Sequence, residues 1–253
     1  MRILISPAKK MRVDGDSLAP TALPRFLEEA EILKNALTGL TAEERRRLWG
    51  CSEAIAQVNE ERLRLMDLFH AVTPAILAYE GIQYQYMAPG VLERKQLDYL
   101  QEHLRIGSGL YGLLCPFDSV APYRLEMQAK LKAAGKKDLY DFWGGKPAEQ
   151  LAAETDWIVN LASKEYSKAV WPHLPRRVGF ISCVFGEKDA GGRVIEKGTL
   201  CKMARGQMVR WMAENHITRP QELCEFEEAG YRYQKAVSTE DQYIFIKGAD
   251  RKC

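Results

Sequence analysis

The sequence opens with a strand-like run, MRILI (residues 1–5), and this run decides the fold. Its aliphatic side chains suit a buried, pleated surface. A strand at the very start of a chain must pair with strands that come much later. Two later runs also read as strands, WIVNL (residues 157–161) and VGFIS (residues 178–182), and residues 242–247 read as a closing strand. Pairing over such distances argues against two separable halves.

Helical patterns fill the sequence between these strands. Apolar residues recur at helical spacing, and helices are expected over residues 25–37, 52–69, 93–104 and 199–215. Thr41 and Glu44 have the spacing of a capping box, in which each side chain satisfies a backbone amide at the start of a helix. No internal repeat or flexible linker divides the chain. We therefore expect an α+β fold, a single domain over residues 1–253 with a mixed β-sheet and surrounding helices.

The composition is that of an ordinary globular protein. The 253 residues are 46% hydrophobic and 28% charged, with a formal net charge of +2. No run approaches the roughly 18 to 20 apolar residues that a membrane helix needs, so no membrane contact is expected. The N-terminal run is too short for a signal peptide. A cytoplasmic location is the expectation that follows.

The residues that usually carry catalysis or bind metals form no recognisable set. The six cysteines and four histidines are scattered, without the spacing of zinc sites or redox dithiols. We expect no metal and no cofactor, and most cysteines should be buried or free thiols. Phosphate-binding loops, nucleophile elbows and dinucleotide motifs are also missing from the sequence. The sequence assigns no catalytic residue and favours a protein without turnover over an enzyme.

Positive charge is local rather than global. Residues 176–219 contain nine Lys or Arg against four Asp or Glu. Within this stretch, Lys202 and Arg205 lie one helical turn apart on one face. A second basic stretch, residues 124–137, is expected to lead into a helix that carries several lysines. Such faces bind polyanions in a salt-dependent way, although most charged runs are only solvated surface.

Five short stretches exceed what packing alone requires, and three of them contain short polar or glycine-rich motifs. ISPAK (residues 5–9) and NLASK (residues 160–164) each place hydroxyl groups and a lysine at the end of a strand, which suits contact with an anion. Solvated strand-exit turns explain the same residues. The third motif, SGLYG (residues 108–112), permits a tight hairpin between two helices, like those that point backbone amides at DNA phosphates. A simple loop is the alternative.

Taken together, the motifs have a recognisable order. They are ISPAK (5–9), SGLYG (108–112), PYRLEM (122–127), DLYDFWG (138–144), NLAS (160–163) and KMARG (202–206). This order resembles the bacterial YaaA family of peroxide stress resistance proteins over nearly the whole chain. The resemblance implies an α+β domain with a positively charged cleft and a helix-hairpin-helix element that bind DNA. It also implies protection against hydrogen peroxide by limiting free intracellular iron, and thus Fenton damage.

The resemblance also implies which residues contact DNA. The hairpin would be Ser108, Gly109, Leu110, Tyr111 and Gly112, and the cleft would contain Lys9, Arg124, Lys164, Lys202 and Arg205. The expected partner is duplex or branched DNA, held by backbone contacts, and the protein is expected to be a monomer. An enzyme acting on a nucleotide or nucleic-acid substrate is the alternative. It is motivated by Ser6, Asn160 and Ser163, polar residues that stand at the ends of apolar strands.

Overall fold

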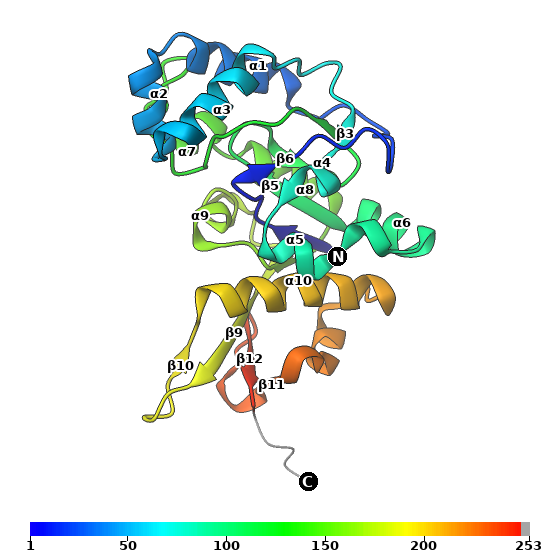
Figure 1. Ribbon diagram of the computed structural model, residues 1–253. Coiled ribbons are helices and arrows are strands. Elements are labelled where there is room, and N and C mark those ends of the chain that lie inside the picture. The colour runs from blue at the N-terminus through cyan, green and yellow to red at the C-terminus, as the bar shows by residue number, and fades with distance from the viewer. Residues whose placement is uncertain (249–253) are drawn as a thin grey trace.

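Strands that are far apart in the sequence lie side by side in one sheet. The computed structural model describes residues 1–248 (Figure 1). Strand β1 (Arg2–Ile5) pairs in parallel with β5 (Leu104–Ser108) on one side and with β8 (Trp157–Asn160) on the other. One hydrophobic cluster extends from Ile3 to Phe245. The expected single α+β domain is confirmed for these residues, and residues 249–253 of the expected range lie outside those described.

The main sheet is mixed, as expected, and its centre is parallel. Its order is β11-β12-β9-β8-β1-β5-β6, and β10 pairs with β9. The remaining strands of this sheet are β6 (Gly112–Leu114), β9 (Gly179–Lys188), β10 (Val194–Ile195), β11 (Tyr231–Tyr233) and β12 (Gln242–Lys247). Strands β12, β9, β8, β1 and β5 run parallel, while β11 and β6 are antiparallel edges.

The order of the parallel strands identifies a favourable place for a ligand. In chain order, the five parallel strands occupy the spatial order 2-1-3-4-5. The chain passes from β1 to β5 on one side and then to β8 on the other, so its direction across the sheet reverses between β1 and β8. Sheets with this order open a crevice at the carboxyl ends of the two strands that flank the reversal.

Helices enclose the sheet and extend the molecule at one end. The helices are α1 (Leu27–Thr38), α2 (Ala42–Trp49), α3 (Glu53–Arg64), α4 (Ala75–Ala78), α5 (Ile82–Met87), α6 (Arg94–His103), α7 (Leu139–Trp143), α8 (Lys146–Glu154), α9 (Lys164–Ser167) and α10 (Gly198–Glu214). Short strand pairs join β2 (Lys10–Met11) to β4 (Tyr79–Glu80) and β3 (Thr73–Pro74) to β7 (Ser119–Val120). Helices α1, α2, α3 and α7 gather at one end, and α10 crosses the middle (Figure 1).

Local sequence explains where several helices begin and end. The capping box at the start of α2 is present, with Thr41 and Glu44 each accepting from the other's backbone amide. Helix α2 ends at Gly50, whose left-handed conformation (φ 54°) lets the chain turn sharply into α3. The expected helices over residues 25–37, 93–104 and 199–215 are also confirmed, to within about two residues at their ends. The helix expected over residues 52–69 is shorter and ends at Arg64.

The packing of α10 against α5 depends on one glycine. A Cβ atom added to Gly206 would lie 2.1 Å from the carbonyl oxygen of Gln83 on α5. Only a residue without a side chain permits this approach of the two helices. The close packing fixes the position of the first half of α10, from which Lys202 and Arg205 project.

The expected helix-hairpin-helix element at residues 108–112 is wrong. This segment joins two antiparallel strands, with Ser108 paired to Gly112. All five residues are buried, so none can reach a DNA backbone. Added Cβ atoms would clash with Leu125 at Gly109 and with Trp143 at Gly112. The glycines therefore serve a tight β-turn and close packing, and pairing with β1 favours strands here over helices.

The expected helix over the lysine-rich stretch after Arg124 is also wrong. Residues 121–137 contain no helix and run mostly as irregular, extended chain. Side chains at alternating positions are buried, namely those of Tyr123, Leu125, Met127, Ala129, Leu131 and Ala133. Such a period of two is typical of extended chain, whereas a helix would bury every third or fourth residue. The lysines between them are exposed because of this alternation.

Candidate functional site

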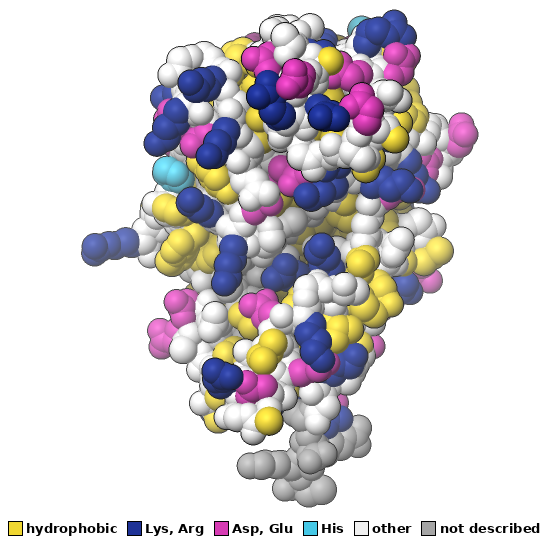
Figure 2. Space-filling view, turned by 60° about the vertical axis from the view of Figure 1, so that its left-hand side comes forward, with side chains coloured by type: hydrophobic (Ala, Val, Ile, Leu, Met, Phe, Trp, Pro, Cys, Tyr) yellow, Lys and Arg dark blue, Asp and Glu magenta, His cyan; other side chains and the backbone are white. Residues whose placement is uncertain are grey.

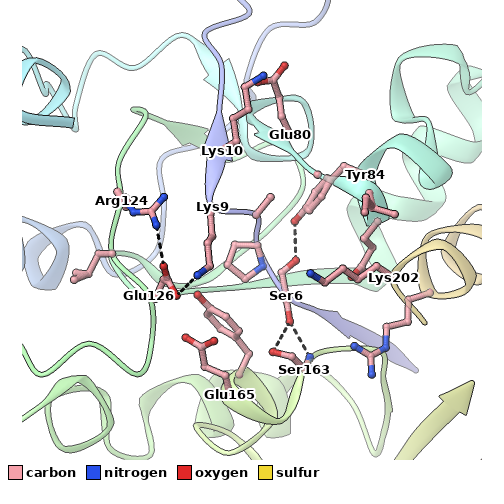
Figure 3. A pocket seen from close by; sticks show the side chains of 18 of the residues that line it. Ser6, Lys9, Lys10, Glu80, Tyr84, Arg124, Glu126, Ser163, Glu165 and Lys202 are labelled. Atoms are coloured by element: carbon pink, nitrogen blue, oxygen red, sulfur yellow. Dashed lines mark hydrogen bonds and ion pairs between the residues drawn. The ribbon is translucent and has the colours of Figure 1, made fainter. Parts of the chain in front are cut away.

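A pocket opens where the direction of the chain across the sheet reverses. It has a volume of about 480 Å³ and lies beyond the carboxyl ends of β1 and β8 (Figure 3). Its walls come from residues 6–10 after β1, residues 80–84, the extended segment 123–126, three residues after β8 (Ser163, Glu165 and Tyr166) and the first half of α10. We call this pocket the central cleft. Figure 2 shows Lys and Arg side chains across the middle of one face, along a hollow in the surface.

Two serines form the floor of the central cleft. Ser6 follows β1, and Ser163 follows β8. The backbone amide of Ser163 donates a hydrogen bond to Ser6 Oγ at 2.8 Å, and the two hydroxyl oxygens lie 3.2 Å apart. The buried Tyr84 hydroxyl donates to the carbonyl oxygen of Ser6 at 3.0 Å. These bonds hold two hydroxyl groups side by side at the bottom of the pocket (Figure 3).

One wall combines basic and acidic side chains. Lys9 Nζ lies 2.9 Å from Glu126 Oε2, and Arg124 Nη2 lies 3.5 Å from Glu126 Oε1. The Arg124 guanidinium also donates to the carbonyl oxygen of Trp49 at 3.3 Å. Lys10 pairs with Glu80 at 3.1 Å, as a cross-strand pair between β2 and β4. The carboxylates of Glu126 and Glu80 therefore balance part of the positive charge on this wall.

The opposite wall carries positive charge with little compensation. Lys202 is exposed, and within residues 1–248 it forms no ion pair. Arg205 contacts Glu196 at 3.7 Å, a long distance for an ion pair. Its Nε atom is buried and has no hydrogen-bond partner in the described chain. Both side chains remain available to an anion.

A second carboxyl group lies below the Lys9–Glu126 pair. Glu165 Oε1 accepts a hydrogen bond from the backbone amide of Gln128 at 3.1 Å. Burial raises the pKa of Glu165 above its ordinary value, and the nearby charge of Glu126 adds to this effect. A carboxyl group with a raised pKa in a cleft is a candidate for proton transfer.

The structure brings together four of the five predicted cleft residues. Lys9, Arg124, Lys202 and Arg205 all line the central cleft. Lys164 does not, although it follows Ser163 directly. It lines a neighbouring pocket together with Lys168 and Trp171.

Sequence reasoning missed several residues of the site. Tyr84 and Gln83 lie on α5, a short helix outside the six ordered motifs. Glu126 and Glu165 were visible as carboxylates, but no sequence spacing places them together, because they are 39 positions apart.

The sequence also gave no reason to connect the α2–α3 turn with the site. Gly50 and the N-cap Ser52 form a tight connection between two helices. This turn borders a pocket of about 350 Å³ that shares Lys9 and Glu126 with the central cleft and adds Arg47 and Lys130. The glycine directly after an expected helix was the signal that could have found it.

The described residues, 1–248, bear on the expectations about metals, membranes and cysteines. In residues 1–248, no three His, Cys, Asp or Glu side chains are grouped so that they could hold a metal ion. No helix in the same range has the length and apolar character needed to cross a membrane. The five described cysteines are free, with Cys183 and Cys201 buried, and Cys253 lies outside the described residues.

Known proteins similar to this chain match it over nearly its whole length. The profile of the family described as "Peroxide stress protein YaaA" matches residues 1–237. A UPF0246 protein from Lachnoclostridium phytofermentans is 50% identical over 248 residues, covering 98% of this chain and 97% of the relative. A UPF0246 protein from Desulfitobacterium hafniense is 50% identical over 253 residues and covers both chains completely. One from Pediococcus pentosaceus is 48% identical, covering 98% of each chain.

Proposed function

This chain belongs to the peroxide stress protein YaaA family, and we propose that it binds DNA through the central cleft as its part in the peroxide stress response. The contacts are made to the sugar-phosphate backbone of duplex or branched DNA and do not read the base sequence. The observation that carries the proposal is the convergence of Lys9, Arg124, Lys202 and Arg205, from three separate motifs, on one cleft.

The charges of the cleft support contact with phosphate groups. Its lining contains five Lys or Arg residues and three glutamates. Lys202 and Arg205 have the least compensated charge, so they gain most from a phosphate partner. Every phosphate that a Lys or Arg neutralises releases counterions, which makes such binding fall steeply with salt.

The α2–α3 turn is proposed as a second contact with the backbone. It takes the role that the resemblance assigns to a helix-hairpin-helix element. Its glycine turn permits a close approach, and the first amides of α3 receive no hydrogen bond from the Ser52 side chain. Backbone amides at a helix start bind phosphate without reading bases. Arg47 and Lys130 flank the turn, and Lys9 connects it to the central cleft.

We further propose that this DNA contact protects cells from hydrogen peroxide, together with a lower level of free intracellular iron. Bound protein would cover backbone sites where iron otherwise associates and generates radicals. The iron part is tested by comparing free iron in cells with and without the protein under peroxide. Equal iron levels in the two kinds of cell would contradict the proposed effect on iron and would leave the proposal of DNA binding unaffected.

The decisive experiment measures DNA affinity as a function of salt. Fluorescence anisotropy with labelled duplex and four-way junction DNA, between about 50 and 200 mM salt, covers the sensitive range. For the variant Lys202→Glu with Arg205→Glu, we expect weaker binding and a log-log salt slope reduced by about two, because two phosphate contacts are lost. Arg94→Glu with Lys95→Glu on α6 is the control, since it changes the charge equally at exposed residues outside the cleft.

Two results would contradict this proposal. One is the absence of binding by the unaltered protein at low salt. The other is an equal loss of affinity in the cleft variant and the α6 control, which would indicate that only the overall charge matters.

A second candidate function is catalysis on a nucleotide or nucleic-acid substrate. The specific observation is the carboxyl pair Glu126 and Glu165, which lines the central cleft together with Lys9 and the two serines. Purified protein would be incubated with nucleotides and damaged DNA, with and without divalent metal ions. Product formation that Glu165→Gln abolishes would favour this function, whereas no turnover under any condition would exclude it for these substrates.

A further inference from the structure

The central cleft is too small for a duplex but large enough for a single nucleotide. Its volume of about 480 Å³ falls in the range of small-molecule pockets, roughly 300 to 1,000 Å³. A DNA backbone can therefore cross its mouth, while only a terminal or separate nucleotide can fill its interior. The interior is not explained by backbone contacts alone.

The charge of the lining exceeds what a backbone phosphate needs. With five basic and three acidic side chains, the lining carries two more positive than negative groups. A phosphodiester in the backbone carries one negative charge. A terminal phosphate has a second ionisation near neutral pH and carries about −1.5 to −2. The charge of the pocket complements a phosphomonoester.

Hydrogen-bond donors without partners point to the same ligand. Arg205 Nε and Gln83 Nε2 are both buried and lack a partner among the described residues, and both residues line the cleft. Gln83 as a whole is only 7% exposed. Buried donors without partners are costly in a folded protein unless something binds them. Ser6 and Ser163, after the strand ends, and Lys202, on α10, line the same cleft.

Apolar walls provide room for the remainder of a nucleotide. Pro7, Ala8 and Ile82 line one part of the cleft, and Tyr123 and Tyr166 line another. Aromatic and aliphatic surfaces of this kind accommodate a sugar and a base without a specific hydrogen-bond pattern. Apolar and polar side chains therefore both line the pocket, and the apolar ones offer surface beside the serines and α10.

We propose that the central cleft holds a phosphomonoester, with the phosphate between the Ser6 and Ser163 hydroxyls and the Lys202 and Arg205 side chains, and the nucleoside against the apolar walls. This inference rests on the proposed function only in placing nucleic-acid chemistry in this cleft. The phosphomonoester comes from one of two sources, a free nucleotide or the 5′-phosphate at a DNA end.

The test compares ligands that differ only in the terminal phosphate. Calorimetry measures deoxyadenosine 5′-monophosphate against deoxyadenosine, with inorganic phosphate as a competitor. Anisotropy measures a labelled single-stranded oligonucleotide with a 5′-phosphate against the same strand with a 5′-hydroxyl. We expect the phosphate to increase affinity about tenfold or more in the mononucleotide pair, because it forms several charge-assisted hydrogen bonds.

The variants separate the pocket from the backbone contacts. Ser163→Ala removes one hydroxyl without changing charge and keeps the amide that donates to Ser6. We expect it to reduce the gain from the phosphate, measured as the ratio of affinities within each pair of ligands. Ser167→Ala is the matched control, because Ser167 lies on the short helix α9, which begins directly after Ser163, and borders the neighbouring pocket instead.

Each outcome bears on the inference. A gain for the mononucleotide alone assigns the site to free nucleotides, and a gain for both ligands assigns it to DNA ends as well. Equal affinity with and without the phosphate, together with intact duplex binding, would overturn the inference and leave the proposed function standing. Phosphate-dependent binding of the mononucleotide without duplex binding would support the inference and contradict the proposed function.

Discussion

The backbone amide of Ser163 donates a hydrogen bond to the hydroxyl oxygen of Ser6, 157 positions earlier in the chain, at 2.8 Å. The bond joins the chain segments that leave two adjacent parallel strands, β1 and β8. It fixes the floor of the central cleft, so the geometry of the site and the stability of the sheet are coupled at this point.

Replacing Ser6 therefore has a predictable cost. Ser6→Ala removes the acceptor of the Ser163 amide and should lower the free energy of unfolding by about 1–3 kcal/mol, the cost of leaving a half-buried donor without a partner. Ser163→Ala keeps this bond and should cost less. Urea unfolding measures both. Equal losses would show that the hydroxyl contact between the serines, not the amide bond, matters.

Gly206 should be the most sensitive position of α10. Gly206→Ala places a Cβ atom 2.1 Å from the Gln83 carbonyl oxygen and should destabilise the protein by about 1–3 kcal/mol as the helices separate. Gly198→Ala, at the start of the same helix, meets nothing within 4 Å and is the control. Thermal unfolding of the two variants distinguishes them. A Gly206→Ala protein as stable as its parent would show that α10 shifts freely against α5.

Asp118 should make stability depend on pH. Burial raises its pKa from 3.8 to about 7, although the Cys115 amide donates a hydrogen bond to its carboxylate. The folded protein thus binds a proton that the unfolded chain has released, and stability should fall as pH rises from about 4 to 7. In Asp118→Asn this decline should become shallower, as measured by urea unfolding at several pH values. Asp98→Asn, at an exposed residue of α6, is the control.

An unchanged slope in Asp118→Asn would mean that other groups determine the pH dependence. His103 has a lowered pKa, mainly because of burial, and contributes in the opposite direction. Because its pKa is lower in the folded state, His103 makes the free energy of unfolding fall as pH falls. Asp118 makes it fall as pH rises, so the two effects are distinguished by their sign.

The thiols of Cys183 and Cys115 should resist hydrogen peroxide. Burial raises the pKa of Cys183 to about 12 and that of Cys115 to about 11. Because the thiolate is the reactive form, both should stay unmodified in the folded protein at pH 7. Peptide mass spectrometry after peroxide treatment, compared with protein in urea, measures this. Rapid oxidation of Cys183 in the folded state would instead indicate a thiol-based response to peroxide.

The sequence predicted secondary structure well where periodicity was strong, and it failed where one local pattern fits two folds. A run such as SGLYG suits a turn between helices or between strands. Only the neighbouring strand β1 decides the matter, by offering hydrogen-bond partners to residues 104–106. In residues 123–133, apolar and polar residues alternate regularly, as is typical of extended chain. The helix expected to carry the lysines there was wrong.

The sequence by itself determined the α+β class, most helix positions, the need of the first strand for distant partners and the ordered motifs that identify the family. Only the tertiary structure decided which polar residues meet. Ser6 and Ser163 become neighbours because β1 and β8 pair in parallel, and Lys202 reaches the cleft because Gly206 lets α10 approach α5. The physical reason is that charge and hydrogen bonding depend on distances between partners, and long-range partners are set by packing rather than by spacing along the chain.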